Sequence, residues 1–230
     1  MRKEHYYTRG ERILWGTSVT AILVSFFLFE RSNYLTLAAS LIGVTSLVLN
    51  AKGNPFGQLL MVIFSLLYGI ISYSFAYYGE MITYLGMTMP MAVFALVAWI
   101  SHPYEEKRFE VKVNKLKKPE IIAMCGVTVL VTILFYFILE YFQTANLFLS
   151  TISVTTSFVA VYLTFRRSPY FALAYAANDV ILILLWVSAS FQNMKYLSVV
   201  VCFAAFLVND LYGFVNWRRM KQRQERKKTS

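Results

Sequence analysis

The sequence predicts an all-α polytopic membrane protein with eight transmembrane helices. Three observations predict this fold class: the abundance of apolar residues, the clustering of charge, and the spacing of the polar breaks. Hydrophobic residues make up 58% of the 230-residue chain and aromatic residues 17%, whereas charged residues make up only 15%. The charges gather in short stretches between long apolar runs, which is how loops and membrane spans alternate. This composition leaves too little polar surface to coat a soluble globule.

Each predicted span can cross a hydrocarbon core of about 30 Å, which takes roughly 20 residues at about 1.5 Å of helix rise per residue. The eight spans are 13–29, 35–50, 55–78, 81–100, 119–141, 147–165, 169–191 and 196–217. Glu30 and Arg31 follow the first span where a cleaved signal would have small residues, so we interpret it as a membrane span. Gly79 and Glu80 form the predicted joint between the third and fourth spans.

The placement of Lys and Arg predicts the orientation. Eight spans put both termini on one side, and of the 22 basic residues only Arg31 and Lys195 fall on the other side. The positive-inside rule therefore predicts that both termini are cytoplasmic. Because the basic residues adjoin apolar segments, their expected partners are lipid head groups of the bilayer and not nucleic acid.

The spans repeat in two groups of three. Val44-Thr45-Ser46 in the second span has a counterpart in Thr155-Thr156-Ser157 in the sixth. Asn-Pro-Phe at 54–56 opens the third span as Ser-Pro-Tyr at 168–170 opens the seventh, and a tryptophan closes both the fourth and the eighth. One intervening span gives both groups the same orientation, so we predict two parallel three-helix repeats, joined by one helix and preceded by an extra N-terminal helix. This arrangement is typical of transporters whose site lies between the repeats.

The repeat defines the expected organisation of the chain. The predicted parts are a tail and extra helix at 1–33, a first bundle at 34–100, a cytoplasmic loop and connecting helix at 101–146, a second bundle at 147–217, and a basic cytoplasmic tail at 218–230.

Polar side chains within the spans predict a site. An Asp at the centre of a span costs about 2.5–3.5 kcal/mol on insertion scales, so it needs a partner or a water-lined cavity. Asn178-Asp179 and Asn209-Asp210 each place a Trp seven residues after the Asp, two helical turns along the same face. Such a stripe suits a heteroaromatic ring or a cation, although interhelical hydrogen bonds and interfacial tryptophans would give the same pattern. The predicted substrate-binding residues are Asn178, Asp179, Tyr175, Trp186, Asn209, Asp210, Tyr68 and Ser65.

Other chemistry has little support in the sequence. His5 and His102 lie in the tail and in a loop, so they form no proton relay within the spans. Cys125 and Cys202 fall inside apolar runs, where a thiol behaves as a small hydrophobe. No phosphate-binding glycine loop or nucleophile motif is present. We therefore expect no catalytic residue, no metal and no cofactor.

The run from Ala177-Asn178-Asp179 to Trp186 and the closing stretch 209–217, Asn-Asp-Leu-Tyr-Gly-Phe-Val-Asn-Trp, resemble the PnuC family of bacterial vitamin and nucleoside transporters. The resemblance covers about residues 34–219, with the first span outside it. Gly213 and Trp217 resemble the family's closing glycine and tryptophan, and Asn178 resembles its ligand-contacting asparagine.

This resemblance implies a homotrimer in the bacterial inner membrane. It also implies facilitated diffusion of a nicotinamide riboside-like substrate, which cytosolic phosphorylation would prevent from returning. Phe171 and Ala174 stand where the family often has tryptophans. This departure leaves a deoxynucleoside, thiamine or riboflavin as alternative substrates.

Two other classes of protein share some of these features. An intramembrane aspartyl protease also needs two carboxylates on facing helices, but Asp179 and Asp210 lack the glycine-rich flanks of such enzymes. A structural membrane protein would use the buried polar groups only to hold its helices together. Uptake of a substrate into liposomes separates transport from both.

Overall fold

The structure is a computed structural model that describes residues 6–74, 78–105 and 107–229. Over this part of the chain, eight helical segments are long and apolar enough to cross a membrane, as the sequence predicted. The helices are α1 (Arg9–Ser25), α2 (Tyr34–Ala51), α3 (Pro55–Ser74), α4 (Tyr78–Ile82), α5 (Met89–Ile100), α6 (Lys118–Tyr141), α7 (Leu147–Phe165), α8 (Phe171–Ser190) and α9 (Leu197–Thr229). π-Helical turns extend α1 (Phe26–Glu30) and join α4 to α5 (Thr83–Thr88), and a 3-10 turn (Met194–Tyr196) precedes α9.

Two segments differ from their predicted bounds. Gly79 and Glu80 lie in the first turn of α4 and not between two spans, while residues 75–77 before them lie outside the described part. The basic segment predicted as a tail continues α9 as one helix through Thr229. No Pro or Gly follows Gly213, so nothing in the sequence ends the helix at the membrane surface.

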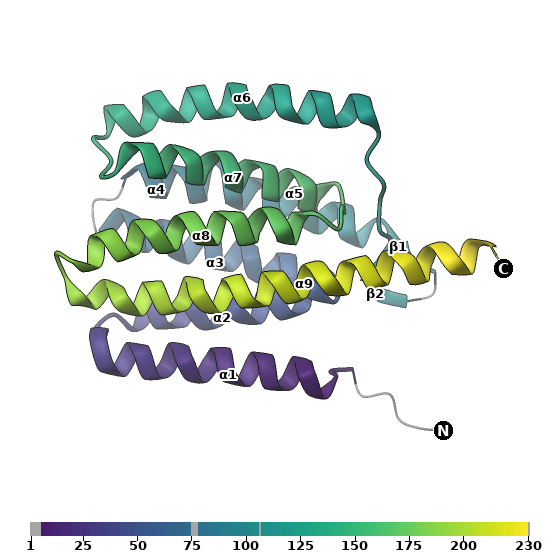
Figure 1. The fold of residues 1–230 in the computed structure, drawn as a ribbon, viewed down its shortest axis with the longest axis horizontal. Coiled ribbons are helices and arrows are strands. Elements are labelled where there is room, and N and C mark those ends of the chain that lie inside the picture. The colour runs from purple at the N-terminus through teal and green to yellow at the C-terminus, as the bar shows by residue number, and fades with distance from the viewer. Residues whose placement is uncertain (1–5, 75–77, 106, 230) are drawn as a thin grey trace.

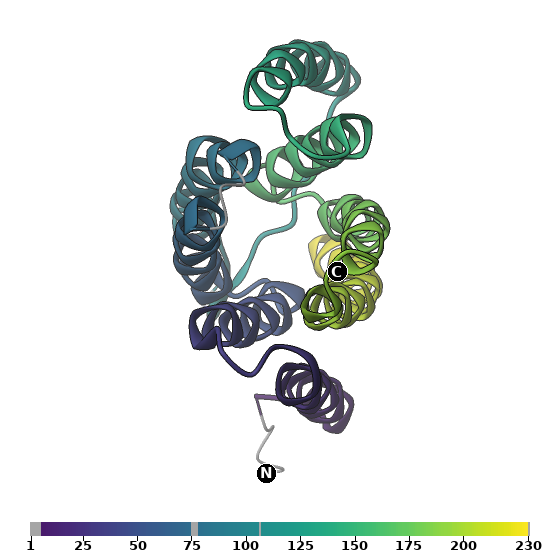
Figure 2. The same cartoon turned by 90° about the vertical axis from the view of Figure 1, so that its left-hand side faces the viewer.

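Six helices form a closed ring. The first three-helix unit is α2, α3 and α4–α5, and the second is α7, α8 and α9. Within each unit neighbouring helices pack together, and the ring closes where α5 meets α7 and where α9 meets α2. The two units face each other, with α1 and α6 at opposite edges of the molecule (Figures 1 and 2). The ring thus has the two repeats predicted from the sequence, with α6 as the joining helix.

Both chain termini lie at the same end of the bundle, which we call the terminal end; the opposite end is the far end (Figure 1). At the terminal end the two junctions of the ring are built alike. The indole Nε1 of Trp99, on α5, donates to the carbonyl oxygen of Thr164 on α7 at 2.9 Å. In the same way Trp217, on α9, donates to the carbonyl oxygen of Asn50 on α2 at 2.7 Å. The two rings contact each other with centroids 5.3 Å apart, and both side chains are fully buried.

The turns beside these carbonyls also match. Gly53 after α2 and Arg167 after α7 both adopt a left-handed conformation, with φ of 68° and 56°. Each N–H donates to the carbonyl oxygen that also accepts from a tryptophan. Glycine tolerates this conformation without steric cost, whereas Arg167 adopts it at some cost. The repeated turn and the reciprocal tryptophan bonds show the similarity of the two units more clearly than the sequence does.

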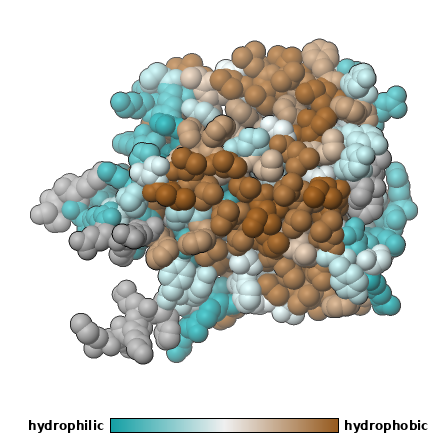
Figure 3. Space-filling model, turned by 180° about the vertical axis from the view of Figure 1, so that it is seen from behind, coloured by the Kyte–Doolittle hydropathy of each residue, from teal (hydrophilic) through white to brown (hydrophobic). Residues whose placement is uncertain are grey.

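A short hairpin covers the terminal end. Strands β1 (Pro103–Tyr104) and β2 (Lys107–Val111) pair antiparallel, and the extended C-terminal part of α9 packs against them. Gln224 is buried there and bonds to the backbone of Val111 and Val113. Figure 3 shows an apolar band across the middle of the molecule with hydrophilic residues at both ends, the surface expected of a chain that spans a bilayer.

Candidate functional site

A cavity of about 40 Å³ lies between the two units of the ring, halfway along the helices. Most of its lining residues are apolar or aromatic, and the few polar ones come from α7, α8, α9 and the π-helical segment before α5. The lining residues are Leu47, Met61, Phe64, Tyr84, Thr88, Ser157, Val161, Tyr175, Asn178, Asp179, Leu182, Phe203, Phe206 and Asp210. A few polar groups in an apolar, aromatic pocket are typical of small-molecule sites. Four of the eight predicted site residues line this cavity: Tyr175, Asn178, Asp179 and Asp210.

Asn178 is held in place by α7. Its side-chain oxygen Oδ1 accepts hydrogen bonds from Ser153 at 3.1 Å and from Thr156 at 2.9 Å. These bonds fix the orientation of the amide and leave its Nδ2 without a hydrogen-bond acceptor among the described residues. The side chain is buried and lines the cavity. Asn178 therefore presents a positioned donor to whatever occupies the cavity.

Asp179 on α8 and Asp210 on α9 form a pair at the cavity. Their carboxyl groups are hydrogen-bond neighbours, and each residue is 4% exposed. A hydrogen bond between two carboxyl groups requires a proton on one of them, because two ionised carboxylates would repel. The second oxygen of Asp179, Oδ2, is buried without a hydrogen-bond partner in the described part of the chain. A donor or a positive charge in the cavity would satisfy this oxygen.

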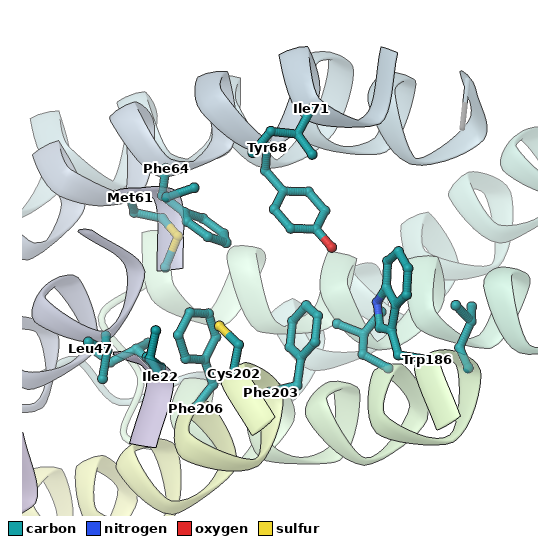
Figure 4. Close-up of a cluster of buried hydrophobic side chains, with 14 of the residues drawn as sticks. Ile22, Leu47, Met61, Phe64, Tyr68, Ile71, Trp186, Cys202, Phe203 and Phe206 are labelled. Atoms are coloured by element: carbon teal, nitrogen blue, oxygen red, sulfur yellow. The ribbon is translucent and has the colours of Figure 1, made fainter. Parts of the chain in front are cut away.

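Aromatic side chains fill most of the space around the pair. Phe64 and Phe206 pack edge to face with ring centroids 5.8 Å apart, and Tyr84 lies 6.1 Å from Phe64. In Figure 4 Met61 and Phe64 extend from α3 toward Phe206, Cys202 and Phe203 on the opposite unit. A ligand pocket measures about 300–1,000 Å³, so these side chains must move apart to admit a ligand that fills such a pocket.

Two smaller cavities, each of about 30 Å³, continue from the central cavity toward the far end. The first shares Tyr84, Ser157 and Leu182 with the central cavity, and it shares Glu80 with the second. The outer one is lined by Tyr68, Trp186 and other residues. Such volumes hold one or a few waters.

The residues of the stripe predicted on α8 line two different cavities and not one. Tyr175 and Asp179 line the central cavity, while Trp186 lies two turns away in the outer one, against Tyr196 at 5.4 Å. Figure 4 shows Tyr68 pointing from α3 into the space between the units, on the side nearer Trp186.

Two predicted site residues lie elsewhere. Asn209 precedes Asp210 but points away from the cavity, and its Nδ2 donates to Ser18 on α1 at 2.9 Å. Asp210 lines the central cavity, whereas Asn209 is held against α1 by this bond. Ser65 is fully buried on α3 and lines none of the three cavities, which leaves it a packing position.

The sequence analysis missed several lining residues, among them Tyr84 and Thr88. Both belong to the π-helical segment between α4 and α5, just before Pro90. Pro90 has no N–H to continue the ladder, and π-helical turns often occur at functional sites. Polar residues before an intramembrane proline were the available signal. Phe64, Phe203 and Phe206 carried no signal that separates them from ordinary core residues.

Two three-helix units around a largely apolar cavity, which holds a few polar groups and lies halfway along the helices, are typical of a membrane transporter. The particular family follows from comparison with known proteins: residues 33–219 match the family described as nicotinamide mononucleotide transporter, and the chain belongs to that family. A curated relative from Neisseria mucosa, named nicotinamide riboside transporter PnuC, is 26% identical over 215 residues, which cover 91% of this chain and 81% of the relative. A solved structure titled "Crystal structure of the Vitamin B3 transporter PnuC" matches with a TM-score of 0.81 and 25% identity, covering 95% of this chain and 94% of that one.

The comparisons confirm the resemblance recognised in the sequence. Because the relatives are named as transporters, they agree with a non-enzymatic role. They favour a transporter over the intramembrane protease, although the carboxyl groups of Asp179 and Asp210 are hydrogen-bond neighbours.

Proposed function

We propose that this transporter takes up a nicotinamide riboside-like nucleoside by facilitated diffusion through the central cavity. The single observation that carries the proposal is the positioned amide of Asn178 in the largely apolar cavity between the two repeats. The Nδ2 donor is suited to the carbonyl of a carboxamide, and the neighbouring aromatic rings are suited to a heteroaromatic ring. The family and the names of the relatives support this substrate class.

Phe171 stands where the family often has a tryptophan, but it is not among the residues that line the central cavity. It packs against Trp217 with centroids 4.9 Å apart, at the terminal end. The aromatic surface of the cavity comes instead from Tyr84, Tyr175 and the phenylalanines of α3 and α9. A deoxynucleoside, thiamine and riboflavin are therefore the alternatives to test.

We expect facilitated diffusion without a coupled ion, with phosphorylation in the cytosol preventing return. No histidine lines the three cavities, so they lack the residue most often used as a proton relay near neutral pH. We further propose, from the family resemblance, a homotrimer in the bacterial inner membrane.

Purified protein in liposomes tests the substrate and the mechanism together. Thermal stabilisation against nucleosides and vitamins identifies the ligand first, since a ligand at 100 times its dissociation constant adds about 2.7 kcal/mol to stability. Uptake of that ligand should then equilibrate across the membrane. Accumulation above equilibrium that a protonophore or removal of sodium abolishes would contradict facilitated diffusion.

The proposed orientation places the terminal end in the cytoplasm. It rests on the positive-inside rule, since Arg31 and Lys195 are the only Lys or Arg residues in the far-end connections. Protease added outside intact cells should leave both termini uncut, and cleavage of a tag at either terminus would reverse the orientation.

A further inference from the structure

We propose that Asp179 and Asp210 together carry one negative charge, and that this charge makes the transporter prefer a monovalent heteroaromatic cation over a neutral ligand of the same shape. This inference rests on the proposed function, because it names the charge of the ligand in the same cavity.

First, in the described part of the chain, no basic side chain borders the pair of carboxyls. No Lys, Arg or His is among the residues that line the central cavity. The ionisable groups nearest the two carboxyls are Tyr84, Tyr175 and Cys202, and none of these side chains can carry a positive charge. Ser157, Leu47 and Met61 complete the wall from the other helices without adding charge.

The second step is a contrast within the chain. In the described residues, every carboxylate with a Lys or Arg ion-pair partner lies at the terminal end. These are Glu11, Glu105, Glu110, Glu120 and Glu225. The sequence therefore supplies basic partners where carboxylates hold the structure together. It supplies none for the two carboxyls in the cavity, although burying an unpaired charge is costly.

The third step counts charge. One proton shared between two carboxyl groups leaves a net charge of −1 spread over both. A ligand with a charge of +1 neutralises the site without the gain or loss of a proton. The buried Oδ2 of Asp179, which has no hydrogen-bond partner among the described residues, is the atom positioned to contact it. Because the ligand itself neutralises the negative charge of the cavity, transport of that ligand needs no coupled ion.

The ligand class follows from the cavity walls. Aromatic faces attract cations through the ring quadrupole, and the cavity brings such faces together with a carboxyl pair. A pyridinium or thiazolium ring offers both a flat surface and a single positive charge. Nicotinamide riboside has such a ring, and its dihydro form has nearly the same shape without the charge.

Binding of these two probes to the purified protein tests the inference. The wild type should bind nicotinamide riboside at least about tenfold more tightly than the dihydro form. Asp179→Asn and Asp210→Asn should each keep the preference, because one carboxylate remains and the new amide replaces the shared proton as a donor. The double variant keeps the volume of both side chains but removes the charge, so its preference should disappear.

Asn209→Ala is the matched control, because it alters a buried polar residue beside Asp210 that faces α1. Its ratio of affinities should equal that of the wild type. Equal affinities in the wild type, or a preference that persists in the double variant, would overturn the inference. If the double variant does not fold, a single variant that loses the preference contradicts a charge shared by the pair.

A wrong substrate in the proposed function can be distinguished from a wrong inference about charge. If neither probe binds, the same comparison is made between thiamine, a cation, and the neutral riboflavin and deoxyuridine. Preference for thiamine then supports the inference while the nicotinamide riboside proposal fails. A neutral best ligand, or no binding of either cation, overturns the inference about charge.

Discussion

The terminal end of the ring and its centre treat buried polar groups in opposite ways. At the terminal end Glu11 is 2% exposed, forms an ion pair with Lys52 at 3.0 Å and accepts a hydrogen bond from Tyr212 at 3.0 Å. At the centre Asp179 and Asp210 are equally buried, and within the described part of the chain their side chains are paired only with each other. We infer from this difference that the paired charges of the terminal end hold the helices together, whereas the two carboxyls at the centre are available to a ligand.

The tryptophan junctions should give the largest effect on stability. Trp217→Ala removes a fully buried ring and its bond to Asn50, so we expect a loss of about 3–5 kcal/mol of unfolding free energy. Trp99→Ala should cost a similar amount, because it breaks the equivalent junction. Thermal unfolding in detergent measures both, and Trp15→Ala is the control, because that indole is 43% exposed and its bond to Thr45 lies at the surface, so its loss should cost less.

The ligand preference of the protein that remains folded should be unchanged in these variants. A tryptophan variant that keeps its stability but changes its ligand preference would contradict our interpretation that the two tryptophans act only on stability.

The two asparagines separate site from scaffold within one repeated motif. Asn178→Ala removes the donor that faces the cavity, so uptake should fall by about tenfold to a hundredfold, as expected for the loss of about 1–3 kcal/mol of binding. Asn209→Ala removes the bond to Ser18 and should lower stability by about 1–2 kcal/mol, with uptake per folded molecule unchanged. Initial rates in liposomes, normalised to folded protein, give the comparison. If Asn209→Ala lowered uptake per folded molecule and Asn178→Ala lowered only stability, Asn209 would be the binding residue and Asn178 the structural one.

The sequence predicted the fold well because burial in lipid imposes strong rules. Span length, Lys and Arg placement and the paired Asn-Pro and Ser-Pro starts were enough for eight helices and two repeats. The cost of burying Asp179 and Asp210 led the sequence analysis to include both in the predicted site, and both line the central cavity. It could not predict that their carboxyl groups touch, because that depends on the rotation of α8 against α9.

Other site residues were beyond prediction for related reasons. Asn209 was included because it shares a motif with Asn178, and only the packing of α1 against α9 shows that it faces the other way. Phe203 and Phe206 look like lipid-facing or core residues until the ring closes around them. The bounds at Gly79 and Glu80 failed because glycine is tolerated inside membrane helices.

Tyr84 tests whether the π-helical segment contributes to binding. Its ring lies 4.5 Å from that of Tyr68, and it borders both the central cavity and the next one. Tyr84→Phe keeps the ring and removes the hydroxyl, so we expect ligand affinity to fall by about twofold to tenfold, the equivalent of about 0.5–1.5 kcal/mol for one hydrogen bond. Isothermal titration measures the change, and Tyr73→Phe on the exposed face of α3 is the control. Unchanged affinity would limit Tyr84 to packing.

The smallest effect is expected where ion pairs are exposed at the terminal end. Lys227 and Glu105 are 57% and 50% exposed and lie 3.4 Å apart, so water screens their attraction. Lys227→Ala should change the unfolding free energy by less than about 0.5 kcal/mol.

Gln224 lies one turn earlier on α9, is 4% exposed and bonds to the hairpin backbone. Gln224→Ala should therefore lower the unfolding free energy by about 1–3 kcal/mol, because it leaves buried backbone groups unsatisfied. Thermal unfolding of the two variants side by side tests whether burial, and not the presence of a charge, decides how strongly α9 is held to the hairpin. A larger loss for Lys227→Ala than for Gln224→Ala would show that the surface charges of this end matter more than its buried hydrogen bonds.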